Sequence, residues 1–334
     1  MLTEKPGNRH MFLCQHHEKD AMQKIKLLDV TLRDGGYKNH FHFLPEEIET
    51  LLKTLDQSGV QYIELGYRNG PLQSNMQPGI TGICNRNYLE CCQILIRNAK
   101  RTVMVHPIHV DESDFKEMRV AGVQAIRVCY SALHRERSFK TIAFAKEYGF
   151  EVFVNITRSS RYTKEELLQM IRNFTPYQPQ AVYLADSNGS FTPGKVQKLF
   201  SYLLERCCVP LGFHAHDNLF LALSNAVAAM QVGVEYLDAS INGYGKGAGN
   251  LRLEAISSFL CAHGVRTFDL CKILDIAGTA ELNLKNATSR VSKKNVMMGI
   301  FDLSQDEEGN FTNHSSFADY DRYLQQQQRR VGNG

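Results

Sequence analysis

The chain has 334 residues, of which 43% are hydrophobic and 22% are charged, and its formal net charge is +3. This length and composition are typical of a globular protein with a sizeable core, built as one large domain or two ordinary ones. The small net charge, without a block of lysine and arginine, argues against a nucleic-acid partner. No apolar run approaches the length of a membrane helix, and the charged-then-apolar pattern of an export signal is missing from the first residues.

Nine cysteines are spread along the chain, an odd number with no C-x-x-C spacing and with two adjacent pairs. Adjacent cysteines have poor geometry for structural disulfides and for zinc sites. Most of the nine lie within apolar patterns, as expected for reduced, buried thiols. We therefore expect a cytoplasmic protein.

Residues 1–24 are polar, contain Pro6-Gly7 and show no sustained period, so we interpret them as a flexible N-terminal arm. From Ile25 onward, apolar strand-like runs alternate with helical patterns. The predicted strands are Ile25–Leu32, Tyr62–Gly66, Thr102–Val105, Ala125–Cys129, Glu151–Ile156, Ala181–Ala185, Leu211–His214 and Tyr236–Ile241. The predicted helices are roughly Pro45–Ser58, Tyr88–Asn98, Asp114–Ala121, Arg135–Tyr148, Lys164–Phe174, Pro193–Arg206, Phe220–Val232 and Leu251–His263.

Glycines punctuate this alternation, because Gly59, Gly122, Gly149 and Gly233 each lie between a helix and the next strand, where a left-handed C-cap is expected. The strands are nearly continuously apolar, which indicates a parallel sheet buried on both faces. Eight strand–helix units close most simply into an α/β fold, a (β/α)8 TIM barrel over residues 25–265. An open doubly wound sheet is the alternative, but no G-x-G-x-x-G follows the first strand.

Beyond the barrel the patterns become weaker. We expect a short C-terminal helical extension over residues 266–303, with helices at Leu270–Ala277 and around Ala280–Ser292, followed by a polar tail over residues 304–334. Polar residues also gather at the carboxyl ends of six predicted strands, where barrel enzymes place their active sites.

A histidine pair follows the seventh predicted strand. Successive side chains of a strand alternate faces, so His214 and His216 point the same way and can bind one metal ion through neutral imidazoles. Asp34, which ends the first apolar run, is the best candidate for a third ligand. Such a set leaves coordination positions open for a chelating α-keto acid, whose carbonyl the metal would polarise. Two hydrogen-bonded core histidines are the alternative.

Candidate catalytic groups surround this predicted metal site. Arg33 can stabilise a developing oxyanion, and Glu64 can hold its guanidinium by an ion pair. Tyr37 lies on the loop above the site and could transfer protons, provided that the metal and Arg33 lower its pKa from about 10. The histidines at positions 40, 42 and 106 are rival bases.

A glycine-rich loop follows the eighth predicted strand, over residues 243–250, and its Lys246 adds a positive charge near the site. Asn250 at its end is a candidate metal ligand or a support for one, with an N-cap for the next helix as the alternative. Asp186 and Asn188 could hold the tautomers of the histidine pair.

Three of these segments together resemble the metal-dependent lyases called DRE-TIM metallolyases, the HMG-CoA lyase-like superfamily. They are Thr31-Leu32-Arg33-Asp34-Gly35, His214-Ala215-His216-Asp217-Asn218 and the loop over residues 243–250. Within the superfamily the chain is most similar to the catalytic barrel of 4-hydroxy-2-oxovalerate aldolase, from about Leu27 to His263.

The resemblance implies a role for each residue of the site. Asp34, His214 and His216 would be the metal ligands, with Asn250 a fourth, while Arg33 would stabilise the enolate and Glu64 would pair with it. Mn²⁺ is our first choice of metal, with Mg²⁺, Zn²⁺ and Co²⁺ also compatible. Where the aldolases carry a histidine and the acyl-CoA condensing enzymes a glutamine, this chain has Tyr37.

The expected function is a carbon–carbon lyase that cleaves or forms a 4-hydroxy-2-oxo acid through a pyruvate-type enolate, with a small 2-oxo acid and an aldehyde as its substrates. A Claisen-type enzyme that condenses an acyl-CoA with a 2-oxo acid is one alternative, and a metal-binding barrel without catalysis is another. We expect a homo-oligomer. The C-terminal segment lacks the tyrosine-containing motif and communication domain of the aldolases, so no dehydrogenase partner is expected.

Overall fold

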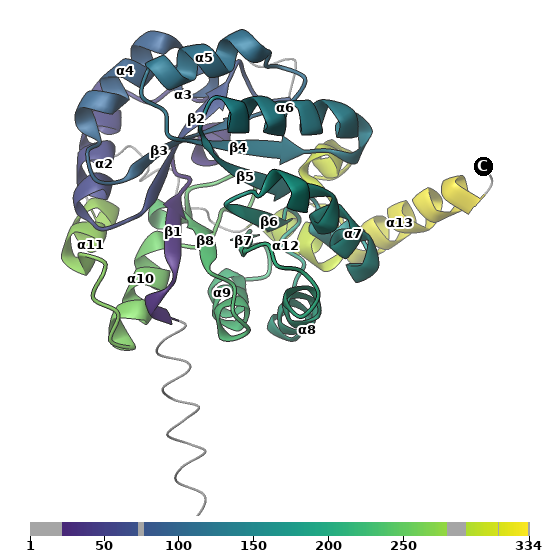
Figure 1. The fold of residues 1–334 in the computed structure, drawn as a ribbon. Coiled ribbons are helices and arrows are strands. Elements are labelled where there is room, and N and C mark those ends of the chain that lie inside the picture. The colour runs from purple at the N-terminus through teal and green to yellow at the C-terminus, as the bar shows by residue number, and fades with distance from the viewer. Residues whose placement is uncertain (1–21, 73–76, 279–291, 313, 333–334) are drawn as a thin grey trace, which may run out of the picture.

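The computed structural model describes residues 22–72, 77–278, 292–312 and 314–332. The predicted N-terminal arm and the helix expected around Ala280–Ser292 therefore lie almost wholly outside the described residues. Eight parallel strands pair in chain order and close into a barrel, and the last strand pairs with the first (Figure 1). The predicted TIM barrel is confirmed.

The strands agree closely with the apolar runs of the sequence. They are β1 (Lys26–Asp29), β2 (Tyr62–Arg68), β3 (Lys100–Val105), β4 (Ala125–Tyr130), β5 (Glu151–Ile156), β6 (Ala181–Asp186), β7 (Leu211–Ala215) and β8 (Tyr236–Ala239). β1 ends three residues earlier than predicted, because the Asp29 carboxylate accepts hydrogen bonds from the Thr31 backbone N and Oγ1 at 3.0 and 2.8 Å. The chain turns there and carries Asp34 on a helical turn above the strand.

The helices surround the sheet, and all eight predicted ones are present within a few residues. They are α2 (Pro45–Gln57), α3 (Ile80–Ile83), α4 (Arg86–Leu95), α5 (Glu112–Val120), α6 (Arg135–Glu147), α7 (Lys164–Phe174), α8 (Pro193–Leu204), α9 (Ala222–Gln231), α10 (Leu253–Ala262), α11 (Leu270–Gly278), α12 (Lys293–Ile300) and α13 (Phe317–Gly332). The four C-cap glycines all have positive φ, as predicted: Gly59 (84°), Gly122 (82°), Gly149 (75°) and Gly233 (106°). No helix in the described ranges has both the length and the apolar character needed to cross a membrane.

The interior of the barrel is layered. Aromatic rings from the first halves of the strands, among them Tyr62, Phe153, Tyr183 and Tyr236, pack edge-on against one another and fill the N-terminal end. The apolar faces of the helices pack on the outside of the sheet in a larger core. Buried charged side chains are stacked above the aromatic layer, since the Arg127 guanidinium lies 4.2 Å from the Tyr183 ring centroid. The barrel is thus closed below and polar above.

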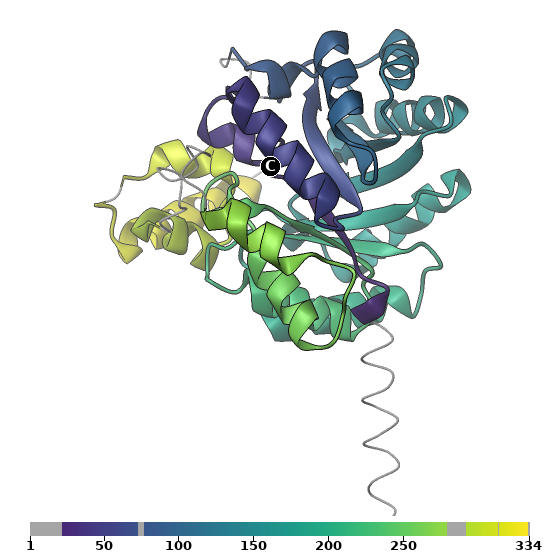
Figure 2. The ribbon, with the colours of Figure 1, turned by 90° about the vertical axis from the view of Figure 1, so that its left-hand side faces the viewer.

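The C-terminal segment, residues 292–332, has a small core of its own and lies to one side of the barrel (yellow in Figure 2). The predicted polar tail contains a 3₁₀ helix at Gln305–Asn310 and the long helix α13, which projects from the body of the molecule in Figure 1. Phe311 and Tyr320 stack at 4.0 Å and anchor it. The Asp302 carboxylate accepts hydrogen bonds from Ser160 and Ser190, both at 2.7 Å, which ties the segment to the strand ends.

Candidate metal centre and active site

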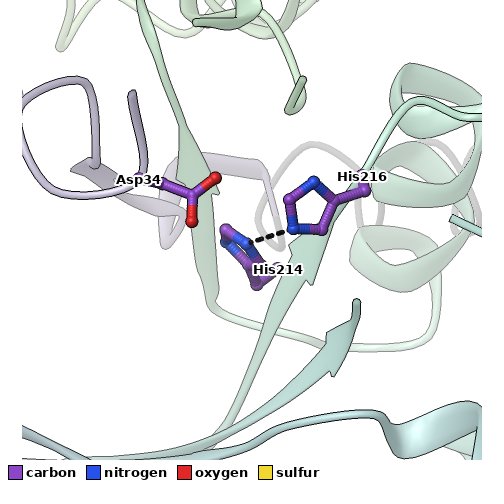
Figure 3. Close-up of side chains that lie close together, drawn as sticks. All are labelled: Asp34, His214 and His216. Atoms are coloured by element: carbon purple, nitrogen blue, oxygen red, sulfur yellow. Dashed lines mark hydrogen bonds between the residues drawn. The ribbon is translucent and has the colours of Figure 1, made fainter. Parts of the chain in front are cut away.

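Asp34, His214 and His216 converge at the carboxyl end of the barrel (Figure 3). All three are buried, and one ligand atom from each lies within 4.8 Å of the others. His214 belongs to β7, whereas His216 lies just beyond it and bridges to Asn250. The two rings stand almost perpendicular, with their Nε2 atoms 3.3 Å apart.

The other nitrogen of each ring is held by the protein. His214 Nδ1 lies 2.8 Å from Asp238 Oδ2, and His216 Nδ1 lies 3.1 Å from the backbone oxygen of Gly249. Both Nε2 atoms therefore remain as the candidate ligand atoms beside Asp34. The expectation that Asp186 and Asn188 hold the tautomers is wrong: the Asp186 carboxylate accepts backbone hydrogen bonds from residues 190 and 191, and Asn188 donates to Asp302.

This arrangement fits a divalent metal ion. Two nitrogens that bind one ion at about 2.0–2.2 Å lie about 3.0–3.5 Å apart, which matches the 3.3 Å between the imidazoles. Burial lowers the pKa of His216 to about 4, although the charge of Asp34 opposes the shift, so the ring is neutral near pH 7. Burial would raise the pKa of Asp34, but Arg33 and the histidines hold it well below its usual range. Neutral imidazoles and a carboxylate are the donors that such ions bind.

Arg33 lies between the metal cluster and a buried glutamate. Its Nη1 donates to Asp34 at 2.5 Å, and its Nε donates to Glu64 at 2.6 Å. The expected Arg33–Glu64 pair is therefore present. Arg33 Nη2 is buried and has no partner among the described residues, so this guanidinium keeps one donor for a bound oxygen.

Arg127 completes the charged layer and was not predicted as a site residue. It is fully buried, and its guanidinium pairs with Asp238 and lies 3.5 Å from Glu64. A continuous chain of contacts therefore connects one metal ligand to another, and it runs through Asp34, Arg33, Glu64, Arg127, Asp238 and His214. A lone arginine within the apolar run Ala125–Tyr130 is the signal that could have revealed it, because a buried charge needs partners.

Tyr37 lines a cavity above the metal cluster, and its hydroxyl donates to the Tyr67 hydroxyl at 3.2 Å. Burial and the neighbouring Tyr67 raise the pKa of Tyr37 well above its ordinary value, so the lowering that a phenolate base needs is not found. His40 and His42 are exposed and lie outside the cavity wall, whereas His106 lines it and stacks on Tyr67 at 5.0 Å. Burial lowers the pKa of His106 to about 3.

Asn250 is buried beneath the glycine-rich loop. It does not cap α10, whose N-cap is Arg252, so that alternative is wrong. Gly245 packs on its amide, where an added Cβ would lie 2.3 Å from Nδ2. Oδ1 of Asn250 is buried without a partner among the described residues, and the backbone of Asn250 bridges to His216. The amide thus retains an acceptor beside a metal ligand.

A cavity of about 180 Å³ opens above the cluster. Its charged walls are Arg33, Asp34, Arg158, Lys246 and Asp306, the last contributed by the C-terminal segment. A neighbouring cleft of about 310 Å³ shares wall residues with it, Arg158 among them, and is lined further out by apolar side chains such as Ile108 and Leu133. The cavity and the adjoining cleft therefore leave space beyond that occupied by the metal ligands.

A closed parallel barrel with metal-ligating and charged side chains at its strand ends is typical of TIM-barrel enzymes. The chain belongs to the HMGL-like family, whose sequence profile matches residues 24–279. It is an enzyme of the aldolase and lyase type within that family.

Among its relatives, 4-hydroxy-2-oxovalerate aldolase from Pelotomaculum thermopropionicum is 32% identical over 78% of this chain and 77% of the relative. The aldolase of the same name from Thermus thermophilus is 31% identical over 75% of this chain and 73% of the relative. The crystal structure of the N-terminal domain of a candidate aldolase from Bacteroides vulgatus has a TM-score of 0.78 and 26% identity, and covers 90% of this chain and 100% of that domain. The carboxyl transferase domain of Rhizobium etli pyruvate carboxylase shares the fold at 14% identity, with a TM-score of 0.65 over 79% of this chain and 48% of the other.

Proposed function

We propose that the protein is a divalent-metal-dependent aldolase that cleaves or forms a 4-hydroxy-2-oxo acid through a pyruvate-type enolate. The observation that carries this proposal is the cluster of Asp34, His214 and His216 with Arg33 beside it on one cavity wall. The relatives named 4-hydroxy-2-oxovalerate aldolase support the same reaction class.

The metal would be held by Asp34, His214 and His216, with the Asn250 amide beside them, and when bound it would supply a Lewis acid that polarises a carbonyl. Arg33 would neutralise the oxyanion that develops on the 2-oxo acid, using its free Nη2 donor. Glu64 positions Arg33 through the buried ion pair. Mn²⁺ is our choice of metal, with Mg²⁺, Zn²⁺ and Co²⁺ as alternatives.

In cleavage, the C4 hydroxyl passes its proton to the ionised oxygen of Tyr37, the C3–C4 bond breaks and an aldehyde leaves. The electron pair of that bond remains on the 2-oxo acid fragment as an enolate, which takes up a proton at C3. We assign Tyr37 as the group that donates a proton to the aldehyde oxygen in the reverse, bond-forming direction. Its raised pKa keeps the phenol protonated for that role.

A cytoplasmic location and the assembly state stay predictions. All eight cysteines in the described ranges are free, which supports a reducing compartment. A homo-oligomer without a dehydrogenase partner is expected, and light scattering of the purified protein would test the first part.

Proton exchange on pyruvate tests the proposed function without an aldehyde or CoA. We expect the protein with Mn²⁺ to exchange the methyl protons in deuterated water, followed by NMR, and a chelator to stop the exchange. Asp34→Asn should lose Mn²⁺ binding and exchange together, whereas Asp275→Asn on the exposed surface of α11 serves as the matched control. Full exchange by Asp34→Asn would contradict the metal assignment, and thiol release from acetyl-CoA only with a 2-oxo acid would favour the condensing enzyme.

A further inference from the structure

Two cations at the outer wall of the cavity are not used by the metal centre. Lys246 and Arg158 both line this wall. Lys246 has no ion-pair partner within the part of the chain that the structure describes, and its Nζ instead lies over the Tyr37 ring. Arg158 pairs with Asp306 of the C-terminal segment, where both side chains are about half exposed, at 50% and 55%.

The geometry of both residues is built into the strand ends. The backbone N of Lys246 donates to Asp34 Oδ2 at 3.0 Å, which fixes the loop next to the metal centre. Arg158 follows β5 with φ +54°, a left-handed conformation that non-glycine residues seldom adopt and that often marks a functional position. Its backbone N donates to Ser187 Oγ at 2.9 Å. Asp306, Arg158 and Lys246 all line the same cavity, and Asp306 is paired with Arg158.

The inner charges balance without these two cations. Arg33 and Arg127 face three carboxylates, those of Asp34, Glu64 and Asp238. This inner group therefore carries one net negative charge, to which a divalent ion adds two positive charges. The carboxylate of one bound 2-oxo acid then brings the total to zero. The charge of Lys246 remains available to the second substrate.

We propose that the aldehyde partner carries an anionic group, a carboxylate or a phosphate, which Lys246 and Arg158 bind. Asp306 supplies a carboxylate to Arg158 in the free protein, and the anion of the aldehyde takes its place. The adjoining cleft, whose wall also includes Arg158, leaves room for an aldehyde longer than acetaldehyde. This inference rests on the proposed aldolase function and names its substrate class.

Matched pairs of aldehydes test the inference. The probes for aldol addition to pyruvate are succinic semialdehyde against butanal, and glyceraldehyde 3-phosphate against glyceraldehyde. We expect kcat/KM to favour the anionic member of at least one pair by about tenfold or more, as for one partly buried charge pair. The pair that shows the preference distinguishes a carboxylate from a phosphate.

Variants identify the residues responsible. Lys246→Gln and Arg158→Gln should each lower the anionic preference about tenfold, mainly through KM, and Asp306→Asn should raise it because it frees Arg158. Lys53→Gln on α2 removes one surface charge from an exposed pair and should leave the preference unchanged. Because Asp306 is exposed, its variant tests the inference even if Lys246→Gln does not fold.

Two results would overturn the inference. One is pyruvate proton exchange by the unaltered protein without any preference for anionic aldehydes, which would leave the proposed function standing. The other is an equal loss of turnover with both members of a pair in Lys246→Gln, which would make Lys246 a proton-transfer group. Absence of pyruvate exchange would instead refute the aldolase function on which the inference rests.

Discussion

At the scale of single residues, the site depends on charges that are buried together. Arg127 is fully enclosed yet contacts Glu64 and Asp238, and Asp238 in turn contacts His214. Removal of one member of such a set leaves an uncompensated buried charge. Arg127, Glu64 and Asp238 therefore help to fix the metal ligands relative to the barrel strands, although none of these three is itself a proposed ligand.

Asp238→Asn tests this transmission. Loss of the charge beside His214 Nδ1 should weaken the imidazole as a ligand, and changes of this kind typically cost about 10- to 100-fold in metal affinity. Calorimetric titration with Mn²⁺ measures the change, with Asp275→Asn as a surface control for the lost charge. An unaltered dissociation constant in the folded variant would show that Asp238 serves the fold alone.

Tyr37→Phe tests the proton-transfer assignment. The variant keeps the ring but loses the hydroxyl, so turnover should fall by about 10²–10⁴, the usual contribution of general acid–base catalysis, while Mn²⁺ affinity stays the same. Tyr67→Phe, which removes only the hydrogen-bond partner of Tyr37, should cost less. Steady-state kinetics with pyruvate and each aldehyde would provide the comparison, and a larger loss in Tyr67→Phe would reverse the assignment.

At the scale of the elements, the ends of strands decide where the functional groups stand. β1 stops at Asp29 because its carboxylate binds Thr31, and the helical turn that follows presents Arg33 and Asp34 to the cavity. The same carboxylate is fully buried, and burial raises its pKa to about 7 from an ordinary 3.8. The residue that ends the strand is therefore a buried carboxyl group whose ionisation is unfavourable.

Asp29→Asn should reveal that cost as a pH dependence. The pKa of Asp29 is higher in the folded state, so folding binds a proton between pH 3.8 and about 7, and the stability of the unaltered protein falls as pH rises through this window. The Asp29→Asn variant has no ionisable group at this position, so its stability does not fall for this reason. Its advantage in unfolding free energy should grow across the window, by on the order of 4 kcal/mol, and level off above it. Urea unfolding at pH 5, 6, 7 and 8 measures this, and a difference that does not change with pH would refute the shift.

At the scale of the whole molecule, the C-terminal segment covers one side of the barrel mouth and contributes a wall of the cavity. Besides the hydrogen bonds of Asp302 with Ser160 and Ser190, ion pairs at the rim connect it to the barrel: Arg158 with Asp306, and Arg161 with Asp302 and Glu307. Most of these side chains are partly exposed, and such pairs contribute little each. The segment should therefore open more readily than the barrel.

Arg161→Gln tests this difference in stability. The variant loses pairs at 3.7 and 3.5 Å to Asp302 and Glu307, so amide hydrogen exchange in residues 302–311 should accelerate by about two- to fivefold. Exchange in the barrel strands should stay slow, as measured by mass spectrometry. As a matched control, Lys53→Gln also removes one charge from a surface ion pair, and it should affect hydrogen exchange in α2 only. Equal protection of the segment and the strands would contradict its separate opening.

The sequence by itself determined the barrel and much of the site. Alternating apolar runs and helical periods, with glycines between them, are local signals, and the positive φ of residues such as Gly59 and Gly233 agrees with them. The H-x-H spacing of His214 and His216 and the acidic end of the first run are also local. Groups at the carboxyl ends of parallel strands gather at one end of the barrel, which is why Asp34 could be assigned to the same site.

Tertiary structure decided what lies between and above these residues. The contact of His214 with Asp238, rather than the expected role of Asp186, follows from strands closing side by side, and nothing in the spacing along the chain encodes it. The high pKa of Tyr37 results from burial and from the neighbouring Tyr67, which belongs to β2. The position of Asp306 in the cavity depends on how a polar segment packs on the barrel, because polar sequence carries no periodic signal for its docking site.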